Sequence, residues 1–305
     1  MSRTIRRGLT ALIAAAGVLV ADGACSERPA DGSRPPAGQP TAGKRLRVAG
    51  IVLKWITADK ERNYARVEPL VRQAAAQGAE LIVTTECFLD GYAIRDKTIP
   101  IDQWHRLAEP IPDGQYVQRL RRLARELRVW MVAGMLERDG TSTFNTAVLI
   151  DPGGDLVGRY HKQRLDHEFV RNTPGHDNPV FATPFGKVGL MICADRRQPE
   201  IARQLRHNGA ELIVCPSGGM WGPQKNDHYL QSRSRENGVP IVFVHPVEFL
   251  VTAADGAILD RRFVGQEMSL PPEKIGTEAD GHLIAIYDLP LDGTGPASSL
   301  PAGAM

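Results

Sequence analysis

One local pattern occurs twice in the chain and limits the folds available to it. Residues 78–86 read GAELIVTTE and residues 209–217 read GAELIVCPS. In each copy a glycine ends a segment with apolar residues at helical spacing, and a short apolar run follows. Glycine commonly ends helices because it adopts left-handed backbone conformations without strain, and a short apolar run between turn signals is typical of a buried strand. The repeat predicts two related halves, each with a helix, a tight turn and a buried strand.

The segments around these copies alternate between helix and strand patterns. Apolar residues at helical spacing predict helices over 60–77, 114–127, 198–207 and 225–237. Apolar runs predict strands over 46–53, 80–85, 129–135, 188–192, 212–215, 241–245 and 283–287. Turn residues predict two hairpins, over 144–160 and around Asp255-Gly256.

Hairpins combined with helix–strand units predict an α/β (α+β) protein. Its sheets would carry helices on one face and pack on each other through the other face. A four-layer α-β-β-α sandwich fits this description, and so does a doubly wound sheet.

The two ends of the chain differ in composition from its middle. Residues 1–24 join arginines to an uncharged apolar run, which is the order of a secretory signal peptide. Residues 25–43 are rich in Pro, Gly, Ser and Ala and predict a flexible tether. Residues 291–305 have the same character and predict a loose C-terminal tail. We therefore expect one folded domain over 44–290.

The N-terminal segment leaves several alternatives open. The apolar run is shorter than the roughly 20 residues that a membrane-spanning helix needs, although an uncleaved anchor is an alternative. Arg6-Arg7 resembles a twin-arginine signal, and Cys25 could carry a lipid, although Asp22 stands where lipoprotein signals have an aliphatic residue. We expect an exported, periplasmic or extracellular protein that contacts a membrane only through an anchor at Cys25.

Charge and cysteine content exclude several classes of partner. The chain has 37 Lys and Arg against 35 Asp and Glu, so its formal net charge is +2. Nucleic-acid binders concentrate basic residues on one face, and this balance gives no reason to expect such a partner. The 4 cysteines contain no Cys-x-x-Cys pair, and no His cluster has metal-ligand spacing, so we predict no metal site. If Cys25 lies in the tether, the other three cannot all pair, and at least one thiol stays free.

Three polar residues follow predicted strands. Glu86 follows the strand over 80–85, Lys162 follows the first hairpin, and Cys193 stands between a strand and a helix. A cysteine nucleophile needs a proton acceptor and a cation or donor for the developing oxyanion, and Glu and Lys supply these. Taken alone, these residues are better explained as a core thiol, a solvated loop charge and a neighbour of a helix cap than as a catalytic site.

Four segments resemble the signature blocks of the nitrilase, or carbon–nitrogen hydrolase, superfamily. ELIVTTECFLDGY (80–92) is similar to the glutamate block, with Thr85 in place of the usual proline, and GRYHKQRL (158–165) is similar to the lysine block. GKVGLMICADRRQPE (186–200) is similar to the cysteine block, and SRSRENGVPIVFV (232–244) to a later Arg-Ala-x-Glu-Asn block. The segments occur in the family's order.

The resemblance implies a four-layer α-β-β-α sandwich of the nitrilase type with a Glu-Lys-Cys triad. Carried over by position, Cys193 is the nucleophile and Glu86 is the general base. Lys162 stabilises the tetrahedral intermediate together with the backbone N–H of Ala194.

Other site residues follow from the same resemblance. Glu168 is the nearest match to a second glutamate that positions the substrate or the lysine. Tyr92, Asp195 and Arg197 are interpreted as structural supports of the site. Trp221 is a candidate for the wall of the substrate pocket, or for a buried wall unrelated to substrate.

The implied reaction is hydrolysis of a non-peptide amide C–N bond, in a small carboxamide or N-carbamoyl compound, through a thioester on Cys193. It needs no metal or organic cofactor. A nitrilase acting through a thioimidate and a non-catalytic binding protein on the same fold remain alternatives. Family members form dimers and larger assemblies, so the resemblance also implies a homo-oligomer.

Overall fold

The computed structural model describes residues 44–219, 223–265 and 281–291. These residues belong to one compact unit, Ala42–Met305. The predicted signal peptide and tether, and the tail beyond Leu291, lie outside the described residues and stay predictions. Within the described ranges, no helix combines the length and the apolar character that crossing a membrane requires.

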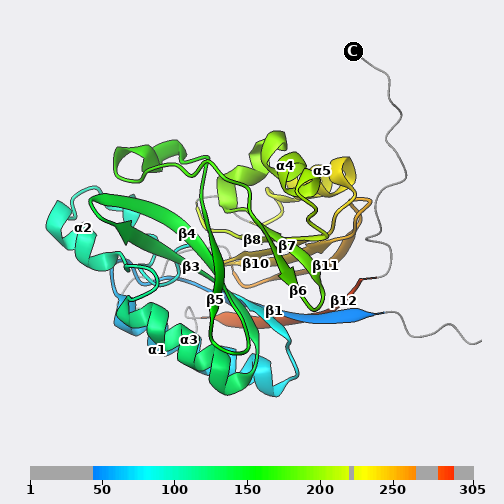
Figure 1. Ribbon diagram of the computed structural model, residues 1–305, viewed down its shortest axis with the longest axis horizontal. Coiled ribbons are helices and arrows are strands. Elements are labelled where there is room, and N and C mark those ends of the chain that lie inside the picture. The colour runs from blue at the N-terminus through cyan, green and yellow to red at the C-terminus, as the bar shows by residue number, and fades with distance from the viewer. Residues whose placement is uncertain (1–43, 220–222, 266–280, 292–305) are drawn as a thin grey trace, which may run out of the picture. The chain divides into compact units, whose positions relative to one another are not determined.

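Two six-stranded sheets form the centre of the domain (Figure 1). The first has the order β12-β1-β2-β3-β4-β5 and the second has the order β11-β10-β9-β8-β7-β6. The strands of the first sheet are β1 (Arg45–Leu53), β2 (Leu81–Val83), β3 (Trp130–Asp139), β4 (Ser142–Ile150), β5 (Leu156–His161) and β12 (His282–Pro290). Those of the second are β6 (Val180–Thr183), β7 (Gly186–Leu190), β8 (Leu212–Pro216), β9 (Ile241–His245), β10 (Glu248–Thr252) and β11 (Ile258–Phe263).

The two copies of the repeated sequence pattern form β2 and β8, which occupy matching places. β2 pairs in parallel with β1 and β3, and β8 pairs in parallel with β7 and β9. Antiparallel strands flank the parallel strands in both sheets. The prediction of two related halves is confirmed.

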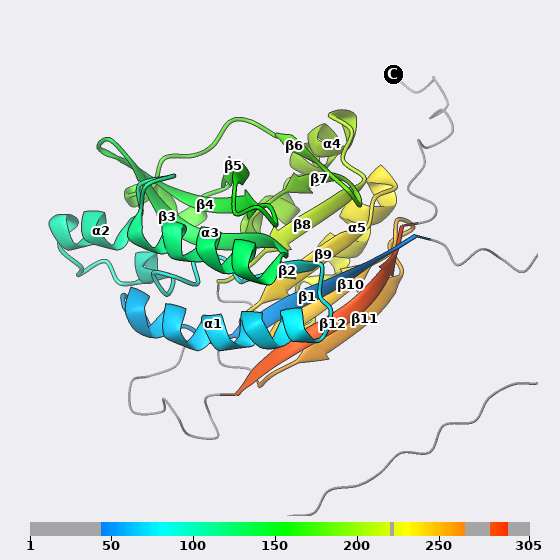
Figure 2. The same cartoon turned by 60° about the horizontal axis from the view of Figure 1, so that its bottom comes forward.

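Helices cover the outer face of each sheet (Figure 2). Two helices, α1 (Lys60–Ala76) and α3 (Gln115–Leu127), lie on the first sheet, and two others, α4 (Pro199–His207) and α5 (Asp227–Asn237), lie on the second. This arrangement confirms the four-layer α-β-β-α sandwich and excludes a doubly wound sheet. The sequence did not predict the short helix α2 (Ile101–Leu107) or strand β6, because each has few buried residues to create a periodic pattern.

The alternation of side chains along the strands separates three apolar clusters. In β1, Val48 and Val52 pack between the two sheets, whereas Ala49 and Ile51 pack under the helices of the first sheet. A third cluster joins the second sheet to α4 and α5. Side chains of a strand point alternately to opposite faces, so a strand buried on both faces is apolar at successive positions.

One glycine sets how closely the sheets approach. A Cβ atom on Gly50 of β1 would lie 2.4 Å from Cδ2 of Phe249, which is fully buried on β10. The aromatic ring therefore occupies the space that a side chain at position 50 would need.

This packing predicts a coupled pair of substitutions. Gly50→Ala overpacks the interface and should lower the free energy of unfolding by about 1–3 kcal/mol. Phe249→Leu leaves a void and should also destabilise the domain. The loss of unfolding free energy in the double variant, measured by urea unfolding, should be smaller than the sum of the two single losses by about 0.5–3 kcal/mol. The reason is that leucine at position 249 makes room for the new methyl group at position 50. Additive losses would show that the two residues do not share this space.

Candidate active site

Cys193 lies in a strained turn after β7. It begins the 3-10 helix η3 (Cys193–Arg197), and its φ of +47° is in the left-handed region that a non-glycine residue rarely adopts. Its Sγ donates to the carbonyl oxygen of Gly218 at 3.4 Å and accepts from Nη1 of Arg196 at 3.5 Å. Strain of this kind persists only where the surroundings hold the residue in place.

The buried carboxylate of Asp195 supplies part of that support. It accepts hydrogen bonds from the backbone N–H groups of Ile192 at 2.9 Å, Gln163 at 3.2 Å and Arg164 at 2.8 Å. It also accepts one from Oη of Tyr160 at 2.8 Å. The turn that carries the cysteine on the second sheet is therefore attached to the loop that follows β5 on the first sheet.

Lys162 follows β5 and is buried between two carboxylates. Its Nζ lies 2.6 Å from Oε1 of Glu86 and 2.5 Å from Oε1 of Glu168. Burial alone would lower the pKa of Lys162, but the two carboxylates outweigh burial and hold this pKa well above its usual value. The ammonium group therefore stays charged inside the protein.

Strand geometry explains why these residues meet. β5 is antiparallel to β4, and β4 is antiparallel to β3, so β5 runs in the direction of β2 and β3. Glu86 and Lys162 thus leave the sheet at the same edge. At this edge β4 supplies Asn145, whose backbone carbonyl oxygen accepts a hydrogen bond from the backbone N–H of Lys162 at 2.9 Å. Its Nδ2 donates to Glu86 at 2.7 Å and to Glu168 at 3.0 Å.

The two carboxylates have different surroundings. Glu168, in the 3-10 helix η2 (Asp166–Val170), also accepts from Oη of Tyr92 at 3.1 Å and from Nδ2 of Asn172 at 3.2 Å. Burial favours its neutral form, but Lys162 and these donors outweigh burial and lower the pKa of Glu168. In contrast, Oε2 of Glu86 is buried with no hydrogen-bond partner among the described residues. Glu86 is therefore the carboxylate with a free oxygen to receive a proton.

Gly218, after β8, lies against both Glu86 and the cysteine. A Cβ atom on Gly218 would come within 2.8 Å of Oε2 of Glu86 and 2.7 Å of the ring of Trp55. Its carbonyl oxygen accepts from the thiol. A glycine is needed here because the backbone passes too close to the carboxylate for any side chain.

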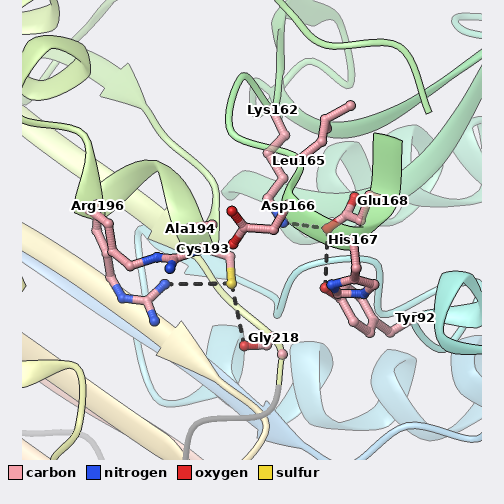
Figure 3. Close-up of a pocket in the computed structure, with 12 residues that line it drawn as sticks. Tyr92, Lys162, Leu165, Asp166, His167, Glu168, Cys193, Ala194, Arg196 and Gly218 are labelled. Atoms are coloured by element: carbon pink, nitrogen blue, oxygen red, sulfur yellow. Dashed lines mark hydrogen bonds and ion pairs between the residues drawn. The ribbon is translucent and has the colours of Figure 1, made fainter. Parts of the chain in front are cut away.

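The cysteine opens into a cavity of about 90 Å³ (Figure 3). The predicted residues that line it are Tyr92, Lys162, Glu168, Cys193, Ala194 and Arg197. Burial and the nearby Glu86 raise the pKa of the Cys193 thiol, and Lys162 and Arg196 oppose this, so the resting cysteine holds its proton. Trp221 lies outside the described residues. Within those residues, no three His, Cys, Asp or Glu side chains are grouped to hold a metal ion.

Sequence reasoning missed three residues of the site. Asn145 stands among other polar residues in the first half of β4 (STFNTAVLI), so no signal in the sequence set it apart. Arg196 stands in the cysteine block, but the resemblance pointed to its neighbour Arg197. Gly218 carried no local signal, because its role depends on the approach of another segment.

Residues 47–273 match the sequence profile of the carbon–nitrogen hydrolase family. The chain belongs to this family. The matched range includes both sheets up to β11 and every residue of the site described above. The protein is therefore a carbon–nitrogen hydrolase, and the resemblance found from the four sequence blocks is confirmed.

Three relatives illustrate the range of similar proteins. The chain is 28% identical over 271 residues to the N-carbamoylputrescine amidase of Arabidopsis thaliana. The matched region covers 82% of this chain and 90% of the relative. It is 30% identical over 214 residues to the human omega-amidase NIT2, and this match covers 66% of this chain and 74% of the relative. It is 34% identical over 174 residues to a nitrilase of Pyrococcus abyssi, covering 56% of this chain and 64% of that protein's length.

Solved structures show the same fold. Nit3 of Saccharomyces cerevisiae, a member of branch 10 of the nitrilase superfamily, has a TM-score of 0.69 and 24% identity and covers 82% of this chain and 92% of its own. A mutant of the Nesterenkonia AN1 amidase has a TM-score of 0.68 and 22% identity and covers 83% and 94%. At this level of sequence identity, the likeness to these structures shows the fold alone, which is the four-layer sandwich.

The buried ion pairs predict how Lys162→Met affects stability. The substitution leaves two buried carboxylates without their cation and should lower the free energy of unfolding by about 3–5 kcal/mol. A buried carboxyl without a cation has a higher pKa in the folded than in the unfolded state, so the variant should become more stable as the pH falls below 7.

Two further variants test this explanation in urea unfolding. Adding Glu168→Gln to Lys162→Met should recover part of the loss, because it removes one uncompensated charge. Lys187→Met, at an exposed lysine, should change stability by no more than about 0.5 kcal/mol. Equal losses at positions 162 and 187 would contradict the proposed electrostatic cause.

Proposed function

We propose that this enzyme hydrolyses a non-peptide amide C–N bond, in a carboxamide or an N-carbamoyl compound, with Glu86, Lys162 and Cys193 as its catalytic triad. The observation that carries the proposal is that Oε2 of Glu86 is buried with no hydrogen-bond partner in the part of the chain that the structure describes. Lys162 occupies the other oxygen of this carboxylate, and Gly218 contacts both the carboxylate and the cysteine turn. A base with one oriented, unoccupied oxygen beside a protonated thiol is what nucleophilic activation requires.

The first half of the proposed reaction forms a thioester. The Cys193 thiol passes its proton to Oε2 of Glu86 while its sulfur attacks the carbon of the scissile amide. The oxyanion of the tetrahedral intermediate is stabilised by the Lys162 ammonium and the backbone N–H of Ala194. Oxyanion donors of this kind contribute roughly 3–4 kcal/mol each to lowering the barrier. Glu86 then gives its proton to the departing nitrogen, the C–N bond breaks, and the acyl group stays on sulfur.

The second half releases the acid. Glu86, again ionised, takes a proton from a water molecule that attacks the thioester carbon. The same two donors stabilise the second oxyanion, and its collapse expels the thiolate, which recovers the proton from Glu86. Glu168 receives four hydrogen bonds and has a lowered pKa, so it stays ionised and holds Lys162 in position.

The relatives support an amide-type substrate. Two of them are named for amidase activities, and one of these acts on an N-carbamoyl compound. A nitrile is the second candidate, because the Pyrococcus abyssi relative is named a nitrilase. On a nitrile the same residues would act through a thioimidate on Cys193.

The deciding experiment is ammonia release from a panel of carboxamides, N-carbamoyl compounds and nitriles. We expect release from an amide or carbamoyl compound, abolished by Cys193→Ala and lowered about 10²–10⁴-fold in kcat by Glu86→Gln. Cys215→Ala is the matched control, because it removes a buried thiol that packs toward α4 and α5, and it should keep activity.

Each other outcome has a distinct meaning. Release from nitriles alone would favour the second candidate. A Cys193→Ala variant that stays active would refute the triad. No release from any compound, with a Cys193 that alkylates as slowly as a buried thiol, would indicate a binding protein that has lost the chemistry.

We also propose that the protein is exported and held at a membrane through Cys25. The support is the order of residues 1–24 and the composition of the tether that follows. Expressed in a bacterium, the full chain should appear in the membrane fraction, and Cys25→Ala should move it to the soluble exported fraction. Full-length protein recovered from the cytosol would contradict export. The homo-oligomer stays a prediction that gel filtration with light scattering would test.

A further inference from the structure

Arg196 contacts the sulfur of Cys193 from the side opposite the triad lysine (Figure 3). It is buried, and its Nη1 lies 3.5 Å from Sγ. Its guanidinium group also lies over the ring of Phe243, with 5.8 Å from Cζ to the ring centroid. A cation at this distance interacts more favourably with a thiolate than with a thiol.

Two buried residues outside the 3-10 helix η3, Asn226 and Glu248, hold Arg196 in this place. Nη2 of Arg196 donates to Oδ1 of Asn226, and Nδ2 of Asn226 donates to Oε2 of Glu248 at 3.4 Å. Both Asn226 and Glu248 are fully buried. The carboxyl group of Glu248 orients the amide of Asn226, because it accepts from the amide nitrogen and so directs the amide oxygen toward Arg196.

Charged and titratable groups surround the sulfur and Arg196 from several elements. Glu86 after β2 opposes thiolate formation, and Lys162 after β5 favours it. On β9, burial and Arg196 lower the pKa of His245 to about 3, so this imidazole is neutral. On β10, burial raises the pKa of Glu248 to about 7, and on β8 burial keeps Cys215 protonated. Arg196 is therefore a second cation beside the sulfur, in addition to Lys162.

We propose that Arg196 stabilises the thiolate of Cys193 as its proton passes to Glu86, and that Asn226 and Glu248 are positioning residues that hold Arg196 against the sulfur. The proposal rests on the nucleophilic role of Cys193 proposed above. It assigns to Lys162 the oxyanion on the substrate and to Arg196 the charge that develops on sulfur.

The test is the pH profile of Cys193 alkylation by iodoacetamide in the full chain, followed by mass spectrometry of the peptide that contains it. Arg196→Gln should slow alkylation near pH 7 about ten-fold and move the profile to higher pH, because a facing opposite charge shifts a pKa by about one unit or more. Arg196→Lys should restore part of the rate. Arg203→Gln, at an exposed arginine of α4, is the matched control and should leave the profile unchanged.

The positioning pair has its own variants. Asn226→Ala removes the acceptor of Arg196 and should shift the profile in the same direction by less than Arg196→Gln. Glu248→Gln can still accept from Asn226 and should stay close to the unmodified chain. Thermal unfolding of each variant shows that it is folded, and a merely structural role would change this measurement without moving the pH profile.

Three results would overturn the proposal. A folded Arg196→Gln with an unchanged profile would show that the arginine does not act on the sulfur. A rise in KM alone, with the profile unchanged, would make Arg196 a substrate contact instead. A Cys193 that reacts no faster than buried Cys87 and Cys215 in the unmodified chain would overturn both this inference and the proposed nucleophile, whereas the first two results leave the nucleophile intact.

Discussion

The site depends on the burial of one ammonium group, that of Lys162. A charged amine away from water is strongly destabilising unless opposite charges and hydrogen bonds surround it. Here Glu86 and Glu168 supply the charges, and Asn145 donates to both carboxylates. These groups come from the ends of two strands, one adjacent strand and a 3-10 helix, so the first sheet has to form in its observed register before the pairs can exist.

The second sheet brings Cys193, the proposed nucleophile, to this charged centre. Cys193 and Gly218 follow β7 and β8, which are parallel neighbours and therefore end at the same edge. Asp195 attaches this edge to the loop that carries Lys162. Because the cysteine turn and the lysine loop share hydrogen bonds, a shift of one sheet on the other would disturb Cys193 and the residues around Lys162 together. The close packing of Gly50 on Phe249 resists such a shift.

Particular residues show how far the sequence could be interpreted. Most helices and strands were predicted, because their apolar residues are periodic, whereas α2 and β6 are short, have few fully buried residues and show no such pattern. Glu86, Lys162 and Cys193 stand at the ends of predicted strands, so their positions in the fold could be predicted from the sequence, whereas their contacts could not. Glu168 was found through the family resemblance, and the structure places it 2.5 Å from Lys162. Asn145 was missed because its partners lie on other elements, and Arg196 was missed because the family pattern pointed to its neighbour Arg197.

The sequence by itself determined most of the helices and strands and, through its four family blocks, the family and the identity of the candidate triad. Periodicity and sequence motifs are properties of the sequence itself, so they can be recognised without knowing which segments pack together. Only the tertiary structure decided which carboxylate keeps a free oxygen, since Tyr92, Asn145 and Asn172 donate to Glu168 and leave Oε2 of Glu86 without a partner among the described residues. It also decided that a second cation lies beside the sulfur. The first is a relation between segments distant in the chain. The second joins two residues of one 3-10 helix, but Asn226, 30 residues away, holds the arginine in place. Both therefore depend on distances that no local pattern contains.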